Sequence, residues 1–181
     1  MNMSDRQALE SLFKKHGYDD FRWIDAKDIV VAQWVRMKCR FGCQEYGQNA
    51  CCPPNVPSVE ECRQFFGEYR TAVVFHFQKS MAEPEDRHDW AKEVNEGLVG
   101  LERDVFIAGH EKAFLLFMDS CGLCKTCTAL REDCKHPRSA RPAPEAMAID
   151  VFSTVRSLGY PIAVLSDYAQ AMNRYAFLMI K

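Results

Sequence analysis

The chain has 181 residues, a formal net charge of −2, 48% apolar residues and nine cysteines. This length fits one domain, 1–181, with enough apolar residues for a core, and the mixed charges give no reason to expect a nucleic-acid partner. No apolar run could cross a membrane, and residues 1–10 lack the apolar stretch of a secretory signal. We therefore expect a cytoplasmic protein with no membrane partner, whose cysteines serve as metal or redox ligands rather than disulfides.

The first half of the chain predicts two helices and three strands. A helix is expected over residues 4–16, where Leu9, Leu12 and Phe13 share one face. Apolar, β-rich segments predict strands over 21–24, 29–37 and 71–77, with a turn at 25–28. Ser58 and Glu61 form a capping-box pattern that starts a helix over 59–69. A histidine in the third strand, His76, is more often a hydrogen-bonded core residue than a ligand.

The second half predicts two helices and three strands. An apolar stripe marks a long helix over 87–109, and an apolar run marks a buried strand over 114–118. Pro144 and Gly159 bound a helix over 144–158, and strands follow over 161–165 and 175–180. Two strand–helix–strand crossovers predict an α+β (mixed α/β) fold: a mixed β-sheet with packed helices and two cysteine-rich metal-binding loops, 39–54 and 121–137.

The second cysteine loop, residues 121–137, has the spacing C-x2-C-x2-C-x6-C and directly follows the 114–118 strand. Three thiols at such short spacing can converge on one centre only from a tight loop, and Gly122 permits the turn. Iron–sulfur clusters use this spacing, whereas zinc sites more often use two separated C-x2-C pairs. The spacing favours a cluster, most simply 4Fe-4S, with ligands Cys121, Cys124, Cys127 and Cys134.

The first cysteine loop, residues 39–54, has the spacing C-x3-C-x7-C-C and contains two glycines. Adjacent cysteines rarely both ligate one metal, so one of Cys51 and Cys52 is expected to be spare. Cys52, directly before Pro53 and Pro54, is the expected ligand. Cys62, in the following helix, either completes this site or faces the core.

Four stretches resemble the uncharacterised family of predicted metal-binding proteins catalogued as domain of unknown function 2284. They span about residues 30–165: Lys38-Cys39-x3-Cys43-x2-Tyr46-Gly47 with Cys52-Pro53-Pro54; Ser58-x2-Glu61 with Glu68-Tyr69; Glu102-x3-Phe106-x2-Gly109-x3-Ala113; and Cys121-x2-Cys124-x2-Cys127-x6-Cys134-x2-Pro137 with Arg141-Pro142 and Glu145-Ala146-x2-Ile149-Asp150-Val151. The resemblance implies metal or iron–sulfur binding and supplies no reaction. Cys51 and Cys62 lie outside the pattern.

Three functions compete at this point. In the first, the second loop holds a cluster and Cys39, Cys43 and Cys52 hold part of a second centre, in a redox or electron-transfer protein with a redox partner protein. A three-cysteine site leaves one metal position open, as a reductase or activating enzyme requires, so catalysis is undecided. In the second, zinc bound by the four loop cysteines, with His136 as a substitute, stabilises an adaptor without activity. Thiol–disulfide chemistry ranks last, because further cysteines crowd the C-x2-C pair.

Overall fold

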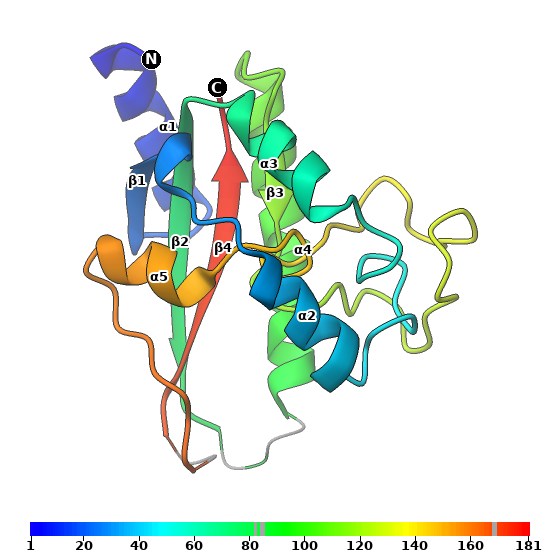
Figure 1. Cartoon of the computed structure of the whole chain (residues 1–181). Helices are drawn as coiled ribbons and strands as arrows, with labels where there is room; N and C mark the ends of the chain where they lie inside the picture. Colours follow the sequence, from blue (N-terminus) through cyan, green and yellow to red (C-terminus); the bar gives the residue numbers. More distant parts are fainter. Residues whose placement is uncertain (82, 84–85, 168–169) are drawn as a thin grey trace.

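A four-stranded antiparallel sheet forms the centre of the fold (Figure 1). Its strands are β1 (Phe21–Asp25), β2 (Thr71–Lys79), β3 (Phe114–Leu116) and β4 (Met172–Met179), in the spatial order β1-β2-β4-β3. The computed structural model describes residues 1–81, 83, 86–167 and 170–181. The predicted α+β class is confirmed by this sheet and the helices that pack on it.

The sheet is antiparallel throughout and not mixed as predicted. β2 and β3 do run in the same direction and are joined by a helix, but β4 lies between them and pairs antiparallel with both. Such a split strand–helix–strand unit contains no parallel hydrogen-bonded pair. The prediction was wrong because it paired strands by sequence order, whereas the last strand of the chain occupies a central position.

Helices cover both faces of the sheet. Helices α1 (Met3–Lys15) and α4 (Asp86–Ile107) pack on one face, against Val73 and Phe75 of β2. Helices α3 (Val59–Gly67) and α5 (Val151–Ser157) pack on the other face, against Ala72 and Val74. Alternate residues of a strand point to opposite faces, so the part of β2 between the two helix layers, residues 72–75, is a continuous apolar run.

Several predicted elements are confirmed with small shifts at their ends. The predicted helices over 4–16, 59–69 and 87–109 correspond to α1, α3 and α4, and the Ser58–Glu61 capping box is present. The predicted strands over 21–24, 71–77, 114–118 and 175–180 correspond to β1 to β4. Among the described residues, no helix is both long and apolar enough to cross a membrane.

The strand predicted over 29–37 is wrong in a way that matters for function. The turn η1 (Ala26–Asp28) is followed by helix α2 (Gln33–Gly42), and only Val31 makes a β-bridge, to Ile149. The β-branched residues end at Val31, apart from Val35, and Gln, Arg, Met and Lys favour helix. Cys39 therefore lies on a helix and not on a loop.

Two further predictions near the C-terminus were wrong. The helix predicted over 144–158 begins only at Val151, because Asp150 caps it by accepting a hydrogen bond from the Ser153 N–H at 3.0 Å. The segment 161–165 is not a strand. Pro161 cannot donate to a sheet, and Val164 is 83% exposed, so this apolar run is not a buried strand.

Candidate functional site

The two cysteine loops lie side by side beyond the β3 side of the sheet, where the cyan and yellow segments meet in Figure 1. The Ala50 N–H donates to the Cys127 sulfur at 3.3 Å, and the Asn55 amide donates to the Ala129 carbonyl at 2.7 Å. These contacts join stretches of chain more than seventy residues apart. The fold therefore brings together the two cysteine motifs.

Two buried polar side chains of α4 fasten the start and the end of the second loop. Asn95, fully buried, accepts a hydrogen bond from the Met118 N–H at 3.2 Å and donates to the Ser120 carbonyl at 3.4 Å. These contacts fix the residues that lead directly into Cys121. Gly122 then turns the chain with a φ of +60°, the left-handed conformation expected from its place in the motif.

Glu102 fastens the end of the loop. Its carboxylate accepts hydrogen bonds from the Leu115 N–H at 2.8 Å and from Arg141 Nε at 3.0 Å, and its second oxygen lies 2.8 Å from Arg141 Nη2. Glu102 is only 6% exposed. This two-point ion pair holds the chain just after the loop against β3 and α4.

Five cysteines line one small cavity of about 40 Å³ at the loop junction. Four are the predicted cluster ligands, and the fifth comes from the first loop. His136 lines the same cavity, as does apolar surface from Ala50, Leu123 and Ala140. The cysteines are Cys51, Cys121, Cys124, Cys127 and Cys134.

The thiols of this cavity influence one another's ionisation. Cys51 donates a hydrogen bond to the Cys121 sulfur, which raises the pKa of Cys51 and lowers the pKa of Cys121. Burial opposes the effect on Cys121, while the backbone N–H groups of Leu123 and Arg141 reinforce it. The lowered pKa of Cys121 favours its thiolate, which is the form that binds metal.

Cys39, Cys43 and Cys52 form a second, separate group. Cys39 lies in the last turn of α2 and Cys43 caps it, so the C-x3-C spacing places both thiols on one side of a helix. Burial and then the charges of Glu45, Cys43, Cys39 and, last, Cys121 of the other group raise the pKa of Cys52 to about 12. The three predicted ligands of the first centre are therefore close enough to interact electrostatically.

The adjacent cysteines of the first loop face different groups. Cys51 joins the cavity of the second loop, whereas Cys52 interacts with Cys39 and Cys43. We expected Cys51 to be spare, but the structure gives it a place beside Cys121. Cys62 is fully buried in the core, where its thiol donates to the Pro57 carbonyl at 3.6 Å.

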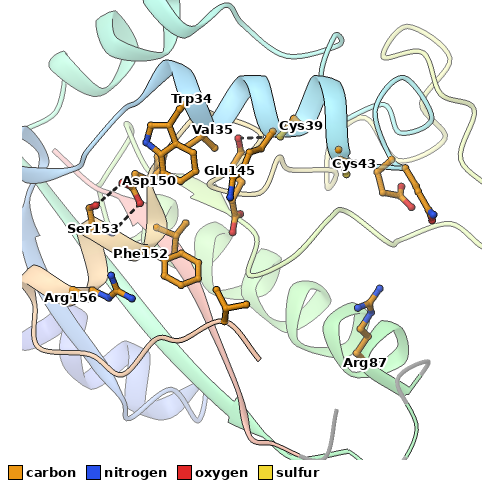
Figure 2. Close-up of a pocket in the computed structure, with 17 residues that line it drawn as sticks. Trp34, Val35, Cys39, Cys43, Arg87, Glu145, Asp150, Phe152, Ser153 and Arg156 are labelled. Atoms are coloured by element: carbon orange, nitrogen blue, oxygen red, sulfur yellow. Dashed lines mark hydrogen bonds between the residues drawn. The ribbon is translucent and has the colours of Figure 1, made fainter. Parts of the chain in front are cut away.

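A pocket of about 760 Å³ opens next to Cys39 and Cys43 (Figure 2). It lies between α2, α5 and the start of α4, and Trp34, Glu145 and Phe152 are among the residues that line it. The Cys39 thiol is 3.9 Å from the Glu145 carbonyl oxygen. Glu145 is exposed to the water of the pocket, but protein crowds it on its other sides, and this desolvation raises the pKa of its carboxyl.

The donor chemistry at the loop junction fits a thiolate-bound metal. Soft sulfur ligands select zinc, copper(I) and iron–sulfur clusters, and two such groups lie here. In the part of the chain that the structure describes, no three His, Cys, Asp or Glu side chains stand as a closed metal-binding set. The cysteines share a cavity, and their side chains would have to converge further to bind one centre.

Sequence reasoning missed the residues that position the cysteines. Asn95 and Glu102 lie seven residues apart on α4, in register with the buried Leu98 and Val105. Two polar residues within an apolar stripe were the available signal, since buried polar groups need partners. The expectation for His76 is confirmed: it contacts Asp20 and Asn173 by hydrogen bonds of 2.6 and 2.8 Å.

Comparison with known proteins gives one finding. The model of a family described as "Predicted metal-binding protein (DUF2284)" matches residues 22–180. No curated protein and no solved structure matches the chain. The match includes both cysteine loops and the α4 side chains that fasten the second one.

Proposed function

Because this chain belongs to the predicted metal-binding protein family DUF2284, we propose that it is an iron–sulfur protein with a redox role. The cluster is 4Fe-4S, with ligands Cys121, Cys124, Cys127 and Cys134. The second centre is a further cluster, with ligands Cys39, Cys43 and Cys52.

One observation carries the proposal: the cavity at the loop junction is lined by five cysteines and by apolar side chains. Thiolates are the usual ligands of iron–sulfur clusters, and the short C-x2-C-x2-C spacing suits a centre with several metal corners. The apolar lining limits the access of water, which influences the reduction potential of a centre. A structural zinc needs only four of these thiols and no second group nearby.

The surface around the second loop supports electron exchange with a redox partner protein. Residues 121–141 contain five Lys or Arg and two Asp or Glu, although the whole chain is net negative. Lys125, Arg131, Lys135 and Arg138 are exposed, and Cys124, Cys127 and Cys134 are partly exposed. A basic surface next to an accessible cluster favours approach by an acidic electron carrier.

The two groups are also suitably placed to exchange electrons with each other. Cys51 and Cys52 are neighbours in sequence, so their Cα atoms lie about 3.8 Å apart. Cys51 lines the second-loop cavity, and Cys52 interacts electrostatically with Cys39 and Cys43 and also with Cys121. In this proposal the second-loop cluster receives electrons at the surface, and the first centre uses them. A centre with three cysteine ligands keeps one position open for a reacting molecule.

The test is anaerobic purification followed by quantification of iron, sulfide and zinc. We expect brown protein with about four iron and four sulfide per cluster, and bleaching of the visible absorbance by dithionite. Cys62→Ser, purified in parallel, should keep the same metal content because Cys62 lies in the core outside both groups. Colourless protein with stoichiometric zinc and no sulfide would refute the iron–sulfur proposal and support the zinc-stabilised adaptor.

A further inference from the structure

The pocket beside the first cysteine group has a volume of about 760 Å³, and the proposed metal centres do not occupy it. Cys39 and Cys43 form part of its wall, so a bound molecule would reach the first centre directly. Its inner surface is apolar, with Val35, Ile149 and Val151 buried beneath it. Mostly apolar pockets with a few convergent polar groups are typical small-molecule sites.

Two aromatic side chains face this pocket from different helices. Figure 2 shows Trp34 of α2 and Phe152 of α5 both directed toward the cavity. Trp34 is 47% exposed, so its ring is accessible to a ligand in the pocket. A flat apolar ligand would bury both rings and gain the contact energy of aromatic pairs.

Three cations line the same pocket, and none has a carboxylate partner among the described residues. Lys38 lies 5.3 Å from the Trp34 ring centroid, and Arg156 lies 5.3 Å from the Phe152 ring centroid. Figure 2 shows Arg87, at the start of α4, on the opposite side of the pocket from Arg156. Arg156 also donates a hydrogen bond to the Ile162 carbonyl at 3.4 Å. Within the described residues, all three cations therefore keep a positive charge that no carboxylate pairs with.

The carboxylates that line the pocket compete only weakly with a bound anion for its three cations. Both oxygens of Asp150 already accept hydrogen bonds from Ser153, at 3.0 and 2.5 Å, to cap α5. Glu145 lies against the Cys39 wall, where protein crowds its carboxyl. Glu45 also lines the pocket, on the loop beyond Cys43. The end near Trp34, Lys38 and Arg156 is left with cations and aromatic rings.

We propose that this pocket binds an organic anion with a flat apolar body, such as an aromatic carboxylate, against the Cys39 and Cys43 side of the first centre. The carboxylate pairs with Lys38 or Arg156 beside the aromatic rings, and the ring packs on Trp34 and Phe152. Arg87 adds positive charge from the opposite side of the pocket. The inference rests on the proposed function for the metal centre that the ligand would approach. It names the substrate class of that centre.

The test measures binding of benzoate to the metal-loaded full chain by calorimetry, with benzamide and benzylamine as neutral and cationic analogues. We expect benzoate to bind best. The double variant Lys38→Gln/Arg87→Gln should weaken benzoate binding about tenfold or more, because one charge-assisted hydrogen bond and the attraction of a second cation are lost. The matched control is Arg40→Gln/Arg103→Gln, which removes the same charge from exposed positions of α2 and α4 outside the pocket.

The same samples distinguish failure of this inference from failure of the proposed function. Iron and sulfide are quantified in each, and saturating benzoate should shift the visible or EPR spectrum of the first centre. If clusters are present, the iron–sulfur proposal stands, and any of four results overturns the inference about the pocket. These are no binding of benzoate, a preference for benzylamine, an equal loss of affinity in the control variant, and an unshifted spectrum. If protein without iron binds benzoate in a charge-dependent way, the pocket is an anion site as proposed, and the iron–sulfur proposal is refuted.

Discussion

The two cysteine loops are built in opposite ways. The first starts on helix α2, so the backbone itself places Cys39 and Cys43 one helical turn apart. The second follows β3, and the structure shows no helix or strand between β3 and α5, a stretch that is described throughout. A helix can hold a pair of ligands without metal, whereas an irregular loop needs its ends fastened and its centre bound.

Side chains of α4 supply those fastenings for the second loop. Asn95 holds the chain before Cys121, and Glu102 holds it after the loop through Arg141. The first loop is held mainly by its own helix and by Arg36, which donates to the Pro57 and Ala146 carbonyls at 3.0 and 2.9 Å. The conformation of the second loop should therefore depend on distant residues and on bound metal far more than that of the first loop.

The largest effect on stability is expected from Glu102→Ala. The variant leaves the partly buried Arg141 without its carboxylate partner and removes the acceptor of the Leu115 N–H. Breaking a buried ion pair from one side costs about 3–5 kcal/mol, and we expect that decrease in the free energy of unfolding by chemical denaturation. The released loop should also exchange its amide hydrogens faster over residues 121–140.

The matched control for this prediction is Glu96→Ala on the same helix. Glu96 is exposed, and its ion pair with Lys92 is 3.9 Å long. Exposed pairs of this kind contribute about 0–1 kcal/mol. Equal destabilisation by the two variants would show that α4 does not fasten the loop through Glu102.

A slightly smaller effect is expected from Cys124→Ala, which tests the dependence of the second loop on metal. Cys124 is partly exposed, so the substitution itself removes little packing. Loss of the centre should lower the free energy of unfolding by about 3–4 kcal/mol, as for a ligand present at several hundred times its dissociation constant. Metal analysis and thermal unfolding of the loaded protein measure both consequences.

Metal-free wild-type protein provides the reference for Cys124→Ala. Without metal the two proteins should unfold at the same temperature, because only the loaded wild type has the stabilising centre. If the loaded variant keeps its metal and its melting temperature, Cys124 is not a ligand. If the variant is less stable even without metal, the thiol has a packing role that the structure does not show.

The sequence predicted most of the fold because the relevant signals are local. The Ser58 capping box, the apolar stripe of α4 and the apolar run of β2 each lie within one element. The place of β4 between β2 and β3 depends on contacts between distant strands, and no local pattern encodes it. The prediction of a strand over 29–37 is wrong from residue 33 onward. A short apolar run does not distinguish a strand from a helix, and the helix propensity of the residues in 33–42 decides the outcome.

The spacing of the cysteines identifies them as candidate metal ligands, but it does not show which cysteines lie together in the fold. The sequence places Cys51 next to Cys52 and far from Cys121, so Cys51 looked spare. Only the fold brings residues 50–55 against 121–129. The cations and aromatic rings of the large pocket come from three helices, and no single stretch of sequence shows them together.

The smallest effects on stability are expected from Cys51→Ser and Cys52→Ser, which test whether neighbouring residues belong to different centres. Cys52 interacts with Cys39 and Cys43, so Cys52→Ser should remove the first centre and lower the iron content. Cys51 contacts Cys121 without being one of the four proposed ligands, so Cys51→Ser should keep both centres and shift only the spectrum of the second-loop cluster. EPR spectra of the reduced proteins separate the two outcomes.

Both serine variants should lose only about 1 kcal/mol of stability, the centre of the range for single substitutions. For Cys52→Ser this follows because α2 holds Cys39 and Cys43 whether or not metal is bound. Cys62→Ser, another buried thiol, gives the cost of the exchange without any metal effect. If Cys52→Ser destabilised the protein as much as Cys124→Ala, the first loop would depend on its metal as the second does. If Cys51→Ser and Cys52→Ser altered the same centre, the two cysteine groups would be one site, and the difference between the loops would lie only in how the backbone holds them.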